Sequence, residues 1–158
     1  MTLNVGDPAP PFELPDAEGK IFHLSDLQGQ WIVLYFYPRD NTPGCIKEAC
    51  GFRDAYAEYQ NQDVVVLGVS TDDAKSHRKF ATKHNLPFPL LIDTDGAIAT
   101  TYGSYGLKKF MGKEYMGITR STFIIAPDGK LAKIYPKVKP EPHAQEVLAD
   151  LAELMATS

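Results

Sequence analysis

The chain has 158 residues, of which 44% are hydrophobic and 23% charged, and its formal net charge at neutral pH is −4. These values fit one globular domain with a hydrophobic core and exclude a disordered or fibrous protein. A net negative charge argues against a general nucleic-acid binder, which needs a basic face. No apolar run approaches the roughly 20 residues that cross a bilayer, so we expect no membrane association.

The N-terminal part predicts short strands joined by turns. Residues 12–14 and 21–24 flank Asp16-Ala17-Glu18-Gly19, a turn sequence that predicts a small β-hairpin. Residues 27–30 follow as a predicted turn. The starting sequence MTLNVGDPAPPF has no basic stretch followed by an apolar core, which argues against a secretory signal and favours a cytoplasmic location.

The next segment predicts a buried strand followed by a helix with a cysteine near its start. Residues 31–37 (WIVLYFY) are apolar on both faces, as in a central strand covered on both sides. A helix is expected from Pro43 to about Tyr59, with Pro43 in the first turn, where a missing N–H costs little. A thiol at a helix N-terminus, such as Cys45, is pushed toward the reactive thiolate by the helix dipole.

The remaining chain continues the alternation of strands and helices. A second two-sided strand is predicted at residues 63–70. Asp72 or Asp73 can cap a helix that runs to about His84 and ends at Asn85 and Pro87. Later elements are a strand at 89–93, a short helix at 98–102, a hairpin of strands 121–126 and 130–135 around Pro127-Asp128-Gly129, and an amphipathic helix with apolar positions at Ala144, Val147, Leu148, Leu151, Leu154 and Met155.

The order of elements is hairpin, βαβαβ, hairpin, helix, which predicts an α/β fold in one domain, residues 1–158. Crossover helices give parallel strands, and the closing hairpin adds antiparallel ones. We therefore expect a mixed central sheet with helices on both faces. This order resembles the thioredoxin-like fold with an N-terminal β-hairpin extension.

The histidines and a group of lysines give weaker indications of a functional site. Of the four histidines, His77 and His84 share a predicted helix, but a separation of seven residues does not suit the usual i, i+4 chelating pair. We therefore expect no metal site and four solvated histidines. Lys108, Lys109 and Lys113 form a loose basic cluster that is interpreted as a solvated loop.

Both cysteines, Cys45 and Cys50, lie in the predicted helix, and two are too few for a disulfide framework. A close pair in a chain without an export signal is more often catalytic or redox-active than structural. The spacing Pro38-x-x-x-Thr42-x-x-Cys45 resembles the active-site signature of the peroxiredoxins. The segments VGDPAPPFELPD, YFYPRDNTPGC, GVSTDD, LPFPLLID and GITRSTFIIAPDGK extend the resemblance over nearly the whole chain. The Q-type subgroup, or bacterioferritin comigratory proteins, has its second cysteine five residues after the first, as here.

The resemblance implies a role for five residues. Cys45 would be the peroxidatic cysteine, which attacks the peroxide and becomes a sulfenic acid, and Cys50 would be the resolving cysteine. Thr42 would contact the peroxide oxygens, Pro38 would shield the site from water, and Arg120 would stabilise the thiolate and orient the peroxide. The chemistry suits these residue types, because an arginine is always charged and a threonine both donates and accepts hydrogen bonds.

Each residue also has a structural alternative. Cys45 could be a small buried hydrophobe, and Cys50 a buried spectator. Thr42 could cap the helix, Pro38 could only end the strand, and Arg120 could be a surface residue.

Three functions compete at this stage. The first is a thiol peroxidase acting on hydrogen peroxide or organic hydroperoxides, without metal, haem or flavin because sulfur does the chemistry. The resemblance further implies a thioredoxin-like reductant and a monomer. The alternatives are a thiol–disulfide oxidoreductase, against which the absence of Cys-x-x-Cys speaks, and a non-catalytic holdase or scaffold.

Overall fold

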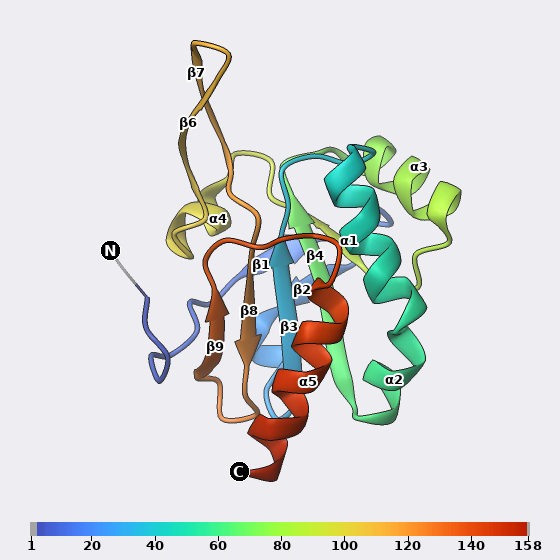
Figure 1. Ribbon diagram of the computed structural model, residues 1–158, viewed down its shortest axis with the longest axis vertical. Helices are drawn as coiled ribbons and strands as arrows, with labels where there is room; N and C mark the ends of the chain where they lie inside the picture. Colours follow the sequence, from blue (N-terminus) through green and yellow to red (C-terminus); the bar gives the residue numbers. More distant parts are fainter. Residues whose placement is uncertain (1–2, 158) are drawn as a thin grey trace.

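The computed structural model describes residues 3–157, and a five-stranded mixed sheet lies at its centre (Figure 1). The strand order is β5-β4-β3-β8-β9, in which β3, β4 and β5 are parallel, β8 is antiparallel to β3, and β9 is antiparallel to β8. The α/β prediction with a mixed sheet is confirmed. The bounds are β3 Trp31–Phe36, β4 Val64–Ser70, β5 Leu90–Ile92, β8 Ser121–Ile125 and β9 Leu131–Tyr135.

The central strand β3 is buried on both faces, as its continuous apolar sequence predicts. Its side chains alternate between two hydrophobic cores. Val33 and Tyr35 pack in one core with Cys45, whereas Leu34 and Phe36 pack in the other. The strand is therefore held rigidly, and so is the start of the loop that leads from it toward Cys45.

Helices cover one face of the sheet (Figure 1). They are α1 Pro43–Asp54, α2 Tyr56–Asn61 and α5 His143–Ala156, and α3 Ala74–His84 adds Phe80 to the same core. The predicted single helix from Pro43 to Tyr59 is wrong in one respect. The chain departs from helical geometry at Ala55 (φ −95°, ψ 2°), which divides it into α1 and α2.

The N-terminal segment covers much of the other face. The predicted hairpin is confirmed as β1 Glu13–Pro15 and β2 Ile21–His23, followed by a 3₁₀ helix, η1 Leu24–Leu27. The only α-helix that packs on this core within the described residues is α4 Ala97–Thr101. The expectation of helices on both faces therefore holds only through this short element.

A second hairpin projects away from the sheet (Figure 1). It consists of β6 Tyr105–Phe110 and β7 Lys113–Ile118, so the interpretation of Lys108, Lys109 and Lys113 as a loop is wrong. Five of its large hydrophobic side chains are exposed. The sequence pattern that predicts a strand assumes a half-buried one, so it did not indicate this hairpin. Its second strand leads directly to Thr119 and Arg120.

Several predicted helix and turn signals appear as expected. Asp73 caps α3 by accepting a hydrogen bond from the Ser76 N–H, and Asn85 ends that helix in the left-handed region. Gly129 (φ 84°) makes the turn between β8 and β9. Within residues 3–157, the structure contains no helix whose length and apolar content would let it cross a membrane.

Candidate active site

The candidate site forms where β3 ends and β8 begins. These strands are antiparallel, with Phe36 opposite Ser121, so Arg120 lies beside the loop that leaves β3. Thr119 and Ser121 hold this end of β8, since the Ser121 hydroxyl donates to the Thr119 carbonyl and lies 2.6 Å from the Ser104 hydroxyl. The Val138 N–H also donates to the Arg120 carbonyl.

Cys45 lies in the first turn of α1 and is almost completely buried, with 1% of its surface exposed. Thr42 is the N-cap residue and Pro43 opens the helix, as the sequence predicts. The N–H groups of this first turn have no partners further back in the helix, so the positive end of the helix dipole lies at the turn that holds Cys45. The structure contains both cysteines as free thiols.

The Arg120 guanidinium bridges Cys45 and a residue that the sequence analysis missed. Its Nη2 donates to the Cys45 Sγ at 3.4 Å, and its Nη1 donates to Glu48 Oε1 at 2.8 Å. A Cβ atom at Gly44 would lie 2.8 Å from Nη2, so the absence of a side chain there leaves room for the guanidinium. The surface alternative for Arg120 is therefore wrong, because only 16% of this side chain is exposed.

Glu48 is a buried carboxyl group next to the reactive sulfur, with 1% of its surface exposed. Burial raises its pKa from 4.5 to about 7, although the charge and the hydrogen bond of Arg120 act in the opposite direction. Its Oε2 has no hydrogen-bond partner among the described residues. When ionised, Glu48 competes with the Cys45 sulfur for the positive charge of the Arg120 guanidinium. The i, i+3 spacing from Cys45 was the signal that could have revealed it.

We expect Glu48→Gln to change how stability depends on pH. Between pH 4.5 and about 7 the folded protein keeps a proton on Glu48 that the unfolded chain has released. The unfolded state then binds fewer protons, so the free energy of unfolding falls as pH rises through this window. Urea denaturation should show that the free energy of unfolding falls more between pH 4.5 and pH 7.5 for the wild type than for the variant. If the free energies of unfolding of wild type and variant differ by the same amount at both pH values, the raised pKa of Glu48 is contradicted.

Thr42 and Pro38 lie on the loop that joins β3 to α1. The Thr42 hydroxyl donates to the Arg39 carbonyl at 3.0 Å and makes no capping hydrogen bond to the helix. It therefore shapes the loop, and the capping alternative is not observed. Pro38 follows the end of β3 and is half-buried.

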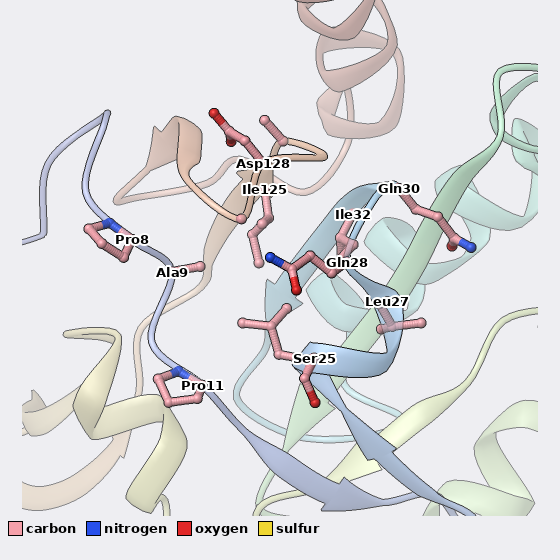
Figure 2. A pocket seen from close by; sticks show the side chains of 13 residues that line it. Pro8, Ala9, Pro11, Ser25, Leu27, Gln28, Gln30, Ile32, Ile125 and Asp128 are labelled. Atoms are coloured by element: carbon pink, nitrogen blue, oxygen red, sulfur yellow. The ribbon is translucent and has the colours of Figure 1, made fainter.

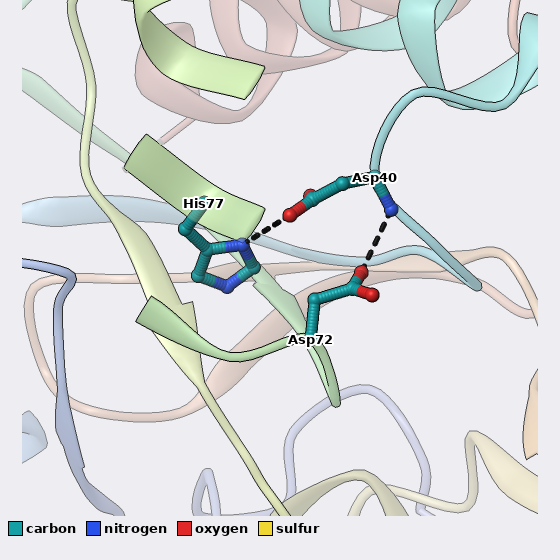
Figure 3. A group of neighbouring side chains, drawn as sticks. All are labelled: Asp40, Asp72 and His77. Atoms are coloured by element: carbon teal, nitrogen blue, oxygen red, sulfur yellow. Dashed lines mark hydrogen bonds and ion pairs between the residues drawn. The ribbon is translucent and has the colours of Figure 1, made fainter. Parts of the chain in front are cut away.

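A buried polar network anchors this loop to α3 (Figure 3). One oxygen of Asp40 accepts hydrogen bonds from His77 Nδ1 at 2.7 Å and from the Ser76 hydroxyl at 2.8 Å. Its other oxygen accepts from the Tyr37 hydroxyl, and the Asp40 N–H donates to Asp72. All polar atoms of the Asp40 carboxylate are thus paired, which fixes the backbone between Pro38 and Thr42.

The prediction of solvated histidines is wrong for His77 and His143, which are both fully buried. The Nε2 atom of His77 lies 2.9 Å from the Leu91 carbonyl, so both ring nitrogens face acceptors and both carry protons. Burial alone would lower the pKa of His77, but the hydrogen bond and charge of Asp40 raise it above its ordinary value. No local pattern indicates that Asp40 is the partner of His77, because the two residues are 37 positions apart.

Asp40, Asp72 and His77 lie close enough together to hold a metal ion. The hydrogen bonds argue against that use. A ring that donates from both nitrogens has no lone pair left for a metal, and the Asp40 oxygens already accept three donors. The cluster suits an internal ion pair that positions the loop.

Cys50 is half-buried and belongs to the same helix as Cys45. Five residues along an α-helix separate two Cα atoms by about 8–9 Å, whereas a disulfide needs about 4.4–6.8 Å. The cysteines therefore cannot bond while α1 is intact. The Cys50 Sγ lies 3.9 Å from His84 Nδ1, at the end of α3.

A pocket of about 270 Å³ lies at the other end of the sheet (Figure 2). It is lined by the N-terminal segment, the start of β3 and the turn between β8 and β9, including Pro8, Ile32 and Ile125. No cysteine, histidine or arginine lines it, so it offers none of the chemistry of the Cys45 site.

Comparisons with known proteins give one consistent result. Residues 5–134 match the AhpC/TSA family. The peroxiredoxin Bcp of Bacillus subtilis is 48% identical over 154 residues, which cover 98% of each chain. The peroxiredoxin Bcp of Escherichia coli is 44% identical over 151 residues, or 96% of this chain and 97% of the relative.

Solved structures agree with these sequence matches. A cysteine-to-serine variant of Xylella fastidiosa PrxQ superposes with a TM-score of 0.91 at 35% identity, covering 97% of this chain and 98% of that one. The bacterioferritin comigratory protein of Xanthomonas campestris, solved in a study of its alkyl peroxide reduction, has a TM-score of 0.85 at 37% identity and covers 90% of each chain.

Proposed function

The chain belongs to the AhpC/TSA family and is a thiol-dependent peroxidase, and from this premise we propose that Cys45 is the peroxidatic cysteine. The observation that carries the proposal is the contact between the Arg120 guanidinium and the Cys45 sulfur at 3.4 Å. Among the described residues, the side chain in hydrogen-bond range of the Cys50 sulfur is a histidine, His84. The peroxidase is therefore the best supported of the three functions considered from the sequence.

In the first step the Cys45 thiolate attacks one peroxide oxygen. A sulfur–oxygen bond forms and the O–O bond breaks. The leaving oxygen takes up one proton, which balances the proton released when the Cys45 thiol became a thiolate, and leaves as water or an alcohol. Arg120 stabilises the negative charge that develops on the leaving oxygen. The Thr42 hydroxyl gives its own proton to the Arg39 carbonyl and can accept a hydrogen bond from the attacked oxygen, which holds that oxygen in line. Pro38 forms one side of the site and shields it from water, and as a proline it offers no backbone N–H group. Cys45 is left as a sulfenic acid.

In the second step the Cys50 thiol attacks the Cys45 sulfenic acid and forms an intramolecular disulfide. Because the two positions are too far apart in the intact helix, α1 must unwind first. Its composition favours this change. Gly44 lies in the part that must open, and a glycine inside a helix weakens it by about 0.5–1 kcal/mol relative to alanine.

The contacts of α1 differ between its two halves. Near its C-terminal end, Phe52 is fully buried and stacks on Tyr35 with ring centroids 4.9 Å apart. Near its N-terminal end, Cys45 and Glu48 are held by Arg120, and oxidation of the sulfur removes the charge that this arginine stabilises. The unwinding is therefore expected to involve residues 43–49 and to spare the turn around Phe52.

We expect one equivalent of hydrogen peroxide to convert the reduced protein into a Cys45–Cys50 disulfide with a shorter α1. Far-UV circular dichroism should lose helical signal, and amide exchange should accelerate over residues 43–49. Peptide mapping identifies the bond. Cys50→Ser is the control, since it should consume one equivalent of peroxide without these changes. A Cys45–Cys50 bond with exchange in α1 unchanged would disprove the unwinding mechanism.

The peroxide substrate and a thiol reductant follow from the family, whereas the identity of each is proposed. We assign hydrogen peroxide and organic hydroperoxides, supported by the alkyl peroxide activity studied in the Xanthomonas relative. A thioredoxin-like protein is the proposed reductant, since it delivers electrons by attacking a disulfide through a mixed disulfide. The chain is proposed to act as a monomer.

A further inference from the structure

His84 contacts the sulfur of Cys50 from a neighbouring helix. Its Nδ1 lies 3.9 Å from the Sγ, within hydrogen-bond range for sulfur. The His84 ring packs edge-on against Phe80, with ring centroids 5.3 Å apart. The Arg53 Nη1 donates to the His84 carbonyl at 2.8 Å, which ties the α1 turn after Cys50 to the end of α3.

The nitrogens of His84 are available for proton transfer, unlike those of the two buried histidines. His77 and His143 each use both ring nitrogens in hydrogen bonds. The Nε2 of His84 has no partner among the described residues, so no hydrogen bond fixes the tautomer and Nδ1 is free to accept.

The charges around His84 favour its neutral form. Burial, with the positive charges of Lys83 and Arg53, lowers the pKa of His84 below its ordinary value. Lys83 lies on α3 and Arg53 on α1, where Arg53 also pairs with Asp54 at 3.0 Å, and the Cys50 thiol lies beside the ring. A neutral imidazole at pH 7 is a base, whereas an imidazolium could only donate.

We propose that His84 is a catalytic residue of the resolving step, which accepts the proton of Cys50 as that thiol attacks the sulfenic acid at Cys45. This inference rests on the proposed function. His84 Nδ1 takes the proton, and the Cys50 sulfur forms a bond to the Cys45 sulfur. The sulfur–oxygen bond of the sulfenic acid breaks, and the leaving hydroxide takes a proton from the imidazolium to become water. Cys50 is oxidised and Cys45 is reduced, so no other oxidant or reductant is needed.

The geometry keeps His84 in place while the other end of the helix unwinds. Cys50 lies between residues 43–49, which must open, and Phe52, which is anchored in the core. Because Arg53 remains bonded to the His84 carbonyl, Cys50 can stay beside Nδ1 as Cys45 swings toward it. The base and the attacking sulfur then form a fixed pair, and Cys45 is the moving partner.

The expected size of the effect follows from the thiol itself. An ordinary thiol is mostly protonated at neutral pH and attacks as the thiolate, so a base that takes its proton accelerates the attack. We expect His84→Asn to slow disulfide formation by about 10-fold at pH 7, because the amide can hydrogen bond to sulfur but cannot accept its proton.

Rapid mixing of reduced protein with one equivalent of hydrogen peroxide tests this. Quenching with acid and a sulfenic-acid trap, followed by mass spectrometry, measures sulfenic acid and disulfide separately. In His84→Asn, sulfenic acid should form at the wild-type rate and the disulfide about 10-fold more slowly. The deficit should shrink as pH rises, because hydroxide can then take the thiol proton in place of His84, and added imidazole should restore part of the rate.

The outcomes distinguish this inference from the proposed function. His23→Asn, at a histidine whose side chain is 42% exposed, is the matched control and should behave as wild type. Equal rates of disulfide formation in His84→Asn and wild type at pH 7 would overturn the role of His84 alone. A deficit independent of pH, or loss of both steps together, would also overturn it by indicating a structural role. Failure of the wild type to form the disulfide would instead refute the resolving step.

Discussion

Replacing Cys45 with serine is expected to reduce peroxide consumption to the uncatalysed background while leaving the fold intact. Serine occupies nearly the same volume in a site where only 1% of the cysteine surface is exposed. The serine hydroxyl stays protonated at pH 7 even beside Arg120 and the helix N-terminus, so the variant has no nucleophile at this position. Cys50 is not expected to replace it, since the side chain in hydrogen-bond range of its sulfur is His84, whereas a guanidinium contacts the Cys45 sulfur.

Peroxide loss measured with chemically reduced protein checks this expectation, with Cys50→Ser as the matched control. Each variant replaces one cysteine sulfur of α1 by a hydroxyl oxygen. Cys50→Ser should consume one equivalent at the wild-type rate and then stop, over-oxidise, or depend on an added thiol. Retention of most of the activity by Cys45→Ser, with the circular dichroism spectrum unchanged, would exclude Cys45 as the nucleophile.

The fold could be predicted from the sequence wherever its signals were local. The two-sided strand at residues 31–37, the cap at Asp73 and the turn at Gly129 depend on neighbours in the chain, and the structure has all of them. The division of the helix at Ala55 and the hairpin at residues 105–118 were missed. The first lacks a glycine or proline at the break, and the second buries too few apolar side chains to stand out.

The candidate site could be predicted only in part, because its key contacts are distant in sequence. Cys45 was recognisable from its place after a strand and at a helix start. Arg120 was identified only through the family resemblance, since its contact with Cys45 spans 75 positions. The same reason hides the pairing of His77 with Asp40. Gly44 shows a further limit, because its role depends on the space that a guanidinium from another element fills.

Removing the Arg120 guanidinium is expected to slow the peroxide step by about 10²-fold or more, the usual cost of losing one donor that stabilises transition-state charge. Arg120→Met would also leave the buried carboxyl group of Glu48 without its partner. Such a loss can destabilise a fold by about 3–5 kcal/mol where the remaining group is charged, as Glu48 is above about pH 7. A single variant would therefore confuse lost chemistry with lost stability.

Combining Arg120→Met with Glu48→Gln separates the two effects. Urea denaturation should show that the double variant regains most of the stability lost by Arg120→Met, because no carboxylate then remains buried unpaired. Stopped-flow measurement of peroxide reduction should show no matching recovery, since no cation lies 3.4 Å from the Cys45 sulfur. Gly44→Ala offers an intermediate case, because the added methyl displaces the guanidinium without removing it. If the double variant recovers its peroxide rate together with its stability, Arg120 acts on the fold and not on the reacting oxygen.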